Sequence, residues 1–215
     1  MNFSEAPITY TLIALNIIFS IIGFTNTNFL NKFIGWPYYE KNNKEYYRML
    51  TSGFLHADWM HLIFNMFTFF SFGRLVEHIY KSYGLGGSIS YIALYFLGLI
   101  AANIPSYLKH NNNDQYRSLG ASGAVSAVLF ASIIFDPWGE IRIYAFPISA
   151  TVFAILYIVY CVYMSKKNVG NVNHDAHLWG SIFGLVFTII LVGLLRSDMY
   201  PRIWEELLKL NWLGN

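Results

Sequence analysis

Three short groups of uncharged polar and small residues lie within or at the heads of otherwise apolar stretches. They read His61-x-x-x-Asn65, Gly120-Ala121-Ser122-Gly123 and His177-x-x-Gly180-x-x-x-Gly184. A serine beside a histidine can perform nucleophilic acyl transfer, because an imidazole titrates near neutrality and can take the hydroxyl proton and return it to a leaving amine. These residues favour a dyad in which Ser122 is the nucleophile and His177 is the general base.

No carboxylate is well placed to extend this dyad to a triad. Asp175 precedes His177 by two residues, so on a helix it points to another face, and we expect it to cap that helix. Acyl transfer also needs donors for an oxyanion. The backbone N–H of Ser122 at a helix N-terminus can supply one, and the side chains of His61 and Asn65 can supply two more.

The elements that carry these groups are predicted from the distribution of charge. Charged residues make up only 12% of the 215 residues, about half the usual fraction, and apolar residues make up 55%. Asp, Glu, Lys and Arg are absent from 6–31, 59–73, 82–108, 118–135, 143–165 and 176–195. A membrane-spanning helix needs about 20 mostly apolar residues. The composition excludes a soluble enzyme, a nucleic-acid-binding domain and a disordered chain.

The sequence therefore predicts an all-α polytopic membrane protein, with residues 1–215 forming one domain. Its six spans are expected at about 8–24, 60–80, 88–107, 122–135, 145–164 and 176–195. The connection 25–59 mixes aromatic and basic residues and is expected to lie in the membrane interface, as is a helix within 199–213. The first span is expected to be retained. Cys161 is the only cysteine, which excludes an internal disulfide, and it is expected to be a small apolar side chain.

The parity of the spans places the three groups at one depth. Spans two, four and six cross in the same direction, and each carries its polar group in its first turn or two. Gly180 and Gly184 on span six and Gly123 on span four allow two backbones to approach closely. This packing can bring Ser122 within reach of His177. The basic residues divide six against eight between the two sides, so they do not orient the chain.

Each group also has a structural explanation. Gly-x-Ser-Gly is common where membrane helices cross, and Ala124 departs from the hydrolase elbow Gly-x-Ser-x-Gly. Paired histidines can hold a haem or a metal. However, no His-Glu-x-x-His is present, and His78 falls at the far end of span two. We expect no cofactor and no metal.

Together, in this order, the three groups resemble those of the rhomboid intramembrane serine proteases of the basic six-span type. The resemblance covers spans one to six and includes His56, five residues before His61, and Gly73-x-x-x-Glu77. It implies that Ser122 is the nucleophile, that His177 is the base, and that His61, Asn65 and the Ser122 amide form the oxyanion site. It implies structural roles for Arg48, His56, Glu77 and the four glycines Gly120, Gly123, Gly180 and Gly184.

Two positions depart from this family's pattern. Tyr47-Arg48 stands where Trp-Arg is frequent, which keeps an aromatic–cation pair. Ser126 stands where a tyrosine often stacks under the catalytic imidazole, which leaves open how His177 is held.

The resemblance implies an endopeptidase that cleaves transmembrane segments of single-span proteins. The expected location is a bacterial plasma membrane, with a cytoplasmic N-terminus and a site open to the exterior. The expected partners are such substrates and the bilayer, with no nucleic acid. One alternative is a catalytically silent relative that binds or escorts membrane clients. Another is a transporter or haem-binding protein, although the lone inward charges that a transporter should need are absent.

Overall fold

A computed structural model describes residues 5–143, 146–167 and 172–209. Its long helices are α1 (Pro7–Thr25), α5 (Trp59–Ser82), α6 (Gly87–His110), α7 (Ser122–Ile133), α8 (Ala150–Lys167) and α9 (His174–Leu195). The short helices are α2 (Thr27–Phe33), α3 (Pro37–Asn42), α4 (Arg48–Thr51) and α10 (Tyr200–Leu208), with 3₁₀ turns at Ser52–Phe54 and Ser197–Met199. Strands β1 (Glu140–Ile143) and β2 (Phe146–Ser149) form an antiparallel hairpin.

The chain is an integral membrane protein. In the described part, α1, α6, α8 and α9 are long and apolar enough to cross a bilayer. The remaining two of the six predicted spans correspond to α5, whose second half carries Arg74, Glu77 and Lys81, and to the shorter apolar helix α7. Large apolar side chains cover the outside of the bundle, among them Ile18, Ile155, Leu156, Val159 and Ile190. An apolar surface of this kind is suited to lipid.

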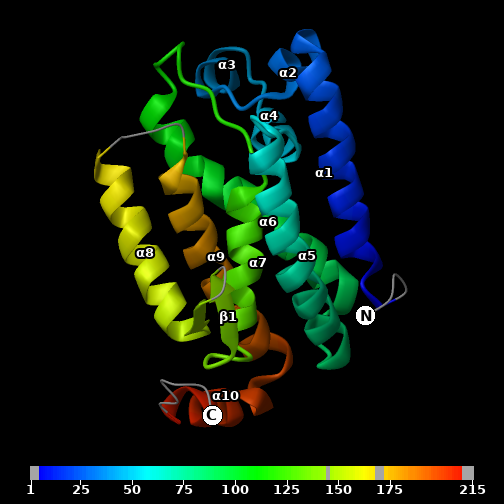
Figure 1. Ribbon diagram of the computed structural model, residues 1–215, viewed down its shortest axis with the longest axis vertical. Coiled ribbons are helices and arrows are strands. Elements are labelled where there is room, and N and C mark those ends of the chain that lie inside the picture. The colour runs from blue at the N-terminus through cyan, green and yellow to red at the C-terminus, as the bar shows by residue number, and fades with distance from the viewer. Residues whose placement is uncertain (1–4, 144–145, 168–171, 210–215) are drawn as a thin grey trace.

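Helix α7 occupies the centre of the bundle. Every residue from Gly123 to Ile133 is buried, and α5, α6 and α9 pack around them. Helix α1 packs on α5 at one side, and α8 packs on α9 at the other. Figure 1 shows α1 and α8 at opposite edges, with α2 to α4 gathered at one end and α10 at the other.

Two predicted helix starts were wrong. The fifth span begins at Ala150 instead of 145, because Phe146–Ser149 pair with Glu140–Ile143. Pro147 also disfavours helix at the residue before it. The sixth span begins at His174 instead of 176, and its cap is the side chain of Asn173, which accepts a bond from the Ala176 N–H at 3.0 Å. The expected cap, Asp175, instead bonds to Ser165 and pairs with Lys109 at 3.5 Å.

The predicted C-terminal helix is present as α10, which ends at Leu208. Residues 210–213 of that prediction lie outside the described residues. Tyr107 and His110, expected at and just beyond the end of the third span, both lie within α6.

Arg48 organises the first loop. Its guanidinium donates hydrogen bonds to the carbonyls of Asn31 and Ile34 at 2.8 and 3.0 Å and to the Glu45 carboxylate at 2.6 Å. It also lies 5.5 Å from the centre of the Tyr47 ring, so the aromatic–cation pair expected from the sequence is present. Arg48 thereby ties α4 to the end of α2.

Glu77, near the end of α5, caps the beginning of α1. The first turn of α1 has no side-chain cap of its own. The fully buried carboxylate of Glu77 accepts bonds from the N–H groups of Ile8 and Thr9 at 3.1 and 2.8 Å and pairs with Lys81 at 2.8 Å. It satisfies amide groups that a helix start leaves without partners, and its negative charge is favoured there.

We expect Glu77→Ala to lower stability by about 3 kcal/mol, because it leaves buried amides unpaired. The Tm of the purified protein in detergent should fall by roughly 10 °C. Glu205→Ala on α10, where the glutamate is exposed, is the matched control and should leave Tm almost unchanged. A Tm for Glu77→Ala equal to that of the control would show that the cap contributes nothing.

Candidate active site

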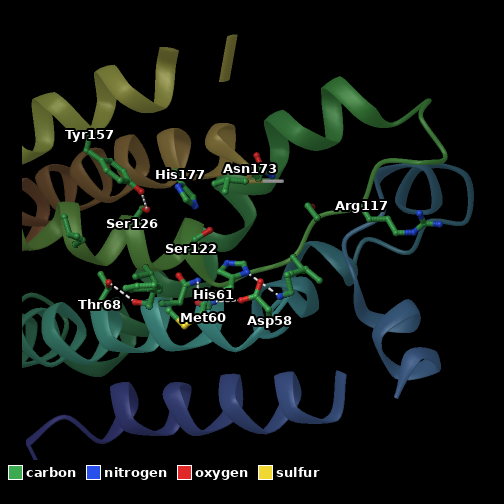
Figure 2. A pocket seen from close by; sticks show the side chains of 18 of the residues that line it. Asp58, Met60, His61, Thr68, Arg117, Ser122, Ser126, Tyr157, Asn173 and His177 are labelled. Atoms are coloured by element: carbon green, nitrogen blue, oxygen red, sulfur yellow. Dashed lines mark hydrogen bonds between the residues drawn. The ribbon is translucent and has the colours of Figure 1, made fainter. Parts of the chain in front are cut away.

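One cavity of about 940 Å³ is lined by four of the residues that the sequence singled out: His61, Asn65, Ser122 and His177. They come from the first two turns of α5, α7 and α9, the helices that correspond to the predicted spans two, four and six. Figure 2 shows the side chains of Ser122 and His177 entering the same space from two helices, with His61 below them. The wall also includes two residues of α8 and residues 115–119.

The position of Ser122 depends on the backbone just before α7. The first loop pairs with this segment through two bonds of 2.9 Å between Gly35 and Ser118, and the Gly120 N–H donates to the Ser52 carbonyl at 3.0 Å. Gly120 has a φ of +127°, and a Cβ there would lie 2.8 Å from the His61 ring. Only glycine suits both requirements. The imidazole of His61 therefore lies directly against the turn that leads into Ser122.

Helices α7 and α9 touch backbone to backbone. A Cβ at Gly180 would lie 2.2 Å from the Gly123 carbonyl oxygen, and a Cβ at Gly184 would lie 2.0 Å from that of Ala127. Gly123 in turn leaves no room for a Cβ beside Ala102 of α6. These small residues allow α9 to carry His177 close to the head of α7.

The ring of His177 is held by a residue that the sequence analysis did not single out. Tyr157 of α8 stacks on it, with ring centres 6.2 Å apart and planes within 13°. The Tyr157 hydroxyl is 3.2 Å from Ser126 Oγ and hydrogen bonds with it. Position 126 is a serine and has no aromatic ring to stack on His177. Tyr157, on the neighbouring helix α8, supplies such a ring instead. Tyr160 and Tyr163 share its helix, so nothing in the sequence distinguished it.

Two side chains of α5 present N–H groups to the cavity. The Ala57 N–H donates to His61 Nδ1 at 3.4 Å, so in a neutral ring the hydrogen lies on Nε2. The Asn65 amide donates one hydrogen to the His61 carbonyl at 3.1 Å, which leaves its second hydrogen for another acceptor. His61 and Asn65 line the same cavity as Ser122. The N–H of Ser122 lies in the first turn of α7, where backbone N–H groups have no acceptor within the helix.

His56 supports this wall from behind. Its Nδ1 hydrogen bonds with Ser20 of α1 at 2.8 Å, and its ring packs edge-on against His61 at 4.9 Å. Burial, together with repulsion from His61, lowers the pKa of His56 to about 3. His56 is therefore neutral at physiological pH and places no positive charge behind the cavity.

Ser126 also lines the cavity, whereas Arg48, His56 and Glu77 do not. Arg48 and Glu77 have the structural roles described above, and Glu77 is at the far end of α5 from His61. Among the described residues, no hydrogen bond joins Ser122 to His177. Their arrangement provides a hydroxyl, an imidazole and a group of N–H donors around one space, which is the set of groups that acyl transfer requires.

The chain is also similar to known proteins. Residues 43–194 match the family model for the rhomboid domain. The chain is 31% identical to rhomboid-like protein 11 of Arabidopsis thaliana chloroplasts over 72% of its length, and 26% identical to the rhomboid protease GlpG of Haemophilus influenzae over 76%. It is 28% identical to the rhomboid protease GluP of Bacillus subtilis over 90%. It spans 55%, 79% and 36% of these three relatives, respectively.

Proposed function

The chain belongs to the rhomboid family, and from this premise we propose that it is an intramembrane serine endopeptidase. The observation that carries the proposal is the convergence of Ser122, His177, His61 and Asn65 on one cavity at the head of α7. Relatives named rhomboid proteases support the same activity. The substrates proposed are single-span membrane proteins.

The reaction follows from the positions of these groups. Ser122 Oγ attacks the scissile carbonyl while the His177 imidazole accepts its proton, and the resulting oxyanion receives hydrogen bonds from His61, Asn65 and the Ser122 N–H. Collapse breaks the C–N bond, and His177 returns the proton to the leaving amine. Water then hydrolyses the acyl ester by the same route. A nucleophile–base hydrogen bond is often long before substrate binds and shortens in the complex.

The substrate helix must unwind to present a carbonyl, because helical carbonyls are already hydrogen bonded. Glycine or proline near the scissile bond therefore favours cleavage. We place the chain in a bacterial plasma membrane with its N-terminus in the cytoplasm, so that the cavity faces the exterior. Its relatives include chloroplast and mitochondrial proteins as well as bacterial ones.

The proposal is tested with purified full-length protein in liposomes and a single-span reporter whose helix contains glycine and proline. We expect one internal cleavage within or beside the span, located by mass spectrometry of both products. A reporter with leucine at the helix-weakening positions is the matched control and should be cleaved more slowly. If the protein binds the reporter but produces no fragment and no serine probe labels Ser122, it is a catalytically silent client-binding protein.

Tyr157 is proposed as a positioning residue for His177. We expect Tyr157→Ala to lower kcat by about 100-fold, because a base displaced by about 1 Å loses about that much rate. Tyr157→Phe keeps the ring and should retain most of the activity. Tyr163→Ala, which removes an exposed tyrosine of the same helix, is the control. Adding Ser126→Tyr to Tyr157→Ala should restore part of kcat, and equal rates for the Ala and Phe variants would show that stacking is irrelevant.

A further inference from the structure

A second group of reactive side chains lies at the interface of α8 and α9. Cys161 of α8 and both His174 and His177 of α9 each place one ligand atom within 4.8 Å of the others. Cys161 is fully buried and His174 is only 6% exposed. Within the described residues, Nδ1 of His174 has no hydrogen-bond partner. An unpaired polar atom in a buried site is costly, so a missing partner is indicated at this place.

The donors in this cluster match one class of ligand. A thiolate and two imidazoles are the ligands of Zn²⁺ and of similar thiophilic cations. Around a tetrahedral Zn²⁺, such donor atoms lie about 3.4 to 3.6 Å apart. The ligand atoms, now within 4.8 Å of one another, would therefore need to approach by at most about 1.4 Å, which side-chain rotations can achieve. Water can take the fourth position.

We propose that Cys161, His174 and His177 form a binding site for Zn²⁺ or a similar thiophilic cation, and that occupation of this site switches off the protease. The proposal replaces the expectation of no metal, which rested on sequence motifs. A motif cannot reveal this site, because its cysteine and histidines come from different helices. Only the inhibitory part rests on the proposed function, since metal binding itself does not require that His177 act as a base.

Inhibition follows from the chemistry of the imidazole. A neutral ring has one nitrogen that carries hydrogen and one with a lone pair. A bound cation occupies the lone pair, so the other nitrogen keeps its hydrogen, whichever of the two faces Ser122. His177 then has nothing with which to accept the hydroxyl proton. The cation would also join α8 to α9 one turn beyond Tyr157, which stacks on the same ring.

The binding half is tested with Co²⁺ on purified full-length protein, because cobalt bound to a thiolate gives a charge-transfer band in the near ultraviolet. We expect this band in the wild type, and we expect Cys161→Ala to abolish it. His174→Asn should weaken Co²⁺ binding by about 100-fold, as the loss of a direct ligand costs at least as much as the loss of an outer one. His78→Ala, which removes an exposed histidine of α5, is the matched control and should bind like the wild type.

Two variants on different helices keep the test valid if one of them fails to fold. Absence of the band in the wild type, or a band of full strength in folded Cys161→Ala, would overturn the site. The regulatory half is measured as the ratio of cleavage rates in Zn²⁺ and in chelator. That ratio should be below about 0.1 in the wild type and in His78→Ala, and near 1 in Cys161→Ala.

The two halves and the proposed function fail in different ways. A cobalt band together with a ratio near 1 in the wild type would overturn the inhibition but leave the site in place. If the chelated protein cleaves no reporter while the band is present, the protease assignment is wrong and the metal site stands.

Discussion

Ser122→Ala and His177→Ala will each lower kcat for a transmembrane reporter by about 10⁴-fold or more. The first variant removes the oxygen of the proposed nucleophile, and the second removes the imidazole of the proposed base. Because the two act as one unit, the double variant should be no slower than the single variants. The measurement is product formation under single-turnover conditions with purified protein in liposomes.

Two controls match these substitutions. Ser132→Ala removes a hydroxyl lower on α7 that donates to the Leu129 carbonyl, and His78→Ala removes the exposed imidazole at the far end of α5. Both should cleave at the wild-type rate. Cleavage at the wild-type rate by Ser122→Ala and His177→Ala would refute the dyad, whereas effects that simply multiply would mean that the two residues act in separate steps.

Asn65→Ala will lower kcat by about 100- to 1,000-fold and leave KM nearly unchanged, because its amide is proposed to bond to the oxyanion and not to the substrate carbonyl. Asn65 is well placed for this because one of its two amide hydrogens is already used within α5, which holds the side chain in a single orientation. Asn65→Asp should be slower still, since it places an acceptor where the negative charge develops. Ser71→Ala, which removes an exposed side chain on the same helix with the same kind of bond to its own turn, is the control.

An increase in KM without a change in kcat would assign Asn65 to substrate binding. Unchanged kinetics would leave His61 and the Ser122 amide as the oxyanion donors.

That the four candidate residues lie around one cavity could be predicted from the sequence, whereas the starts of two helices could not. Ser122, His177, His61 and Asn65 could be placed together because helix parity and the absence of charge are properties of whole spans. The start of α8 was wrong because Phe146–Ser149 are apolar enough for a membrane helix, and only their pairing with Glu140–Ile143 excludes it. Asp175 was taken for a cap because its competitor Asn173 has the same capping ability, and the choice depends on where the helix begins.

Contacts that single residues outside the three groups make with distant helices could not be predicted. Tyr157 lies 20 residues before His177, and its role depends on how α8 and α9 pack. The same holds for Glu77, whose partners at the start of α1 are 68 and 69 residues away. A lone residue carries no periodic signal, so its partner becomes visible only when the two helices are placed in space.

The length of α7 has a consequence for the proposed hydrolysis, which needs water at Ser122. Its 12 residues span about 18 Å, whereas the hydrocarbon layer is about 30 Å thick. Helix α7 is therefore about 12 Å shorter than the hydrocarbon layer is thick. Ser122 is the first residue of this short helix, and the cavity lies beside it. The cavity of about 940 Å³ beside Ser122 has room for water. If the proposed function holds, the short central helix thereby leaves room beside Ser122 for the water that hydrolysis consumes, within a protein whose outer surface is suited to lipid.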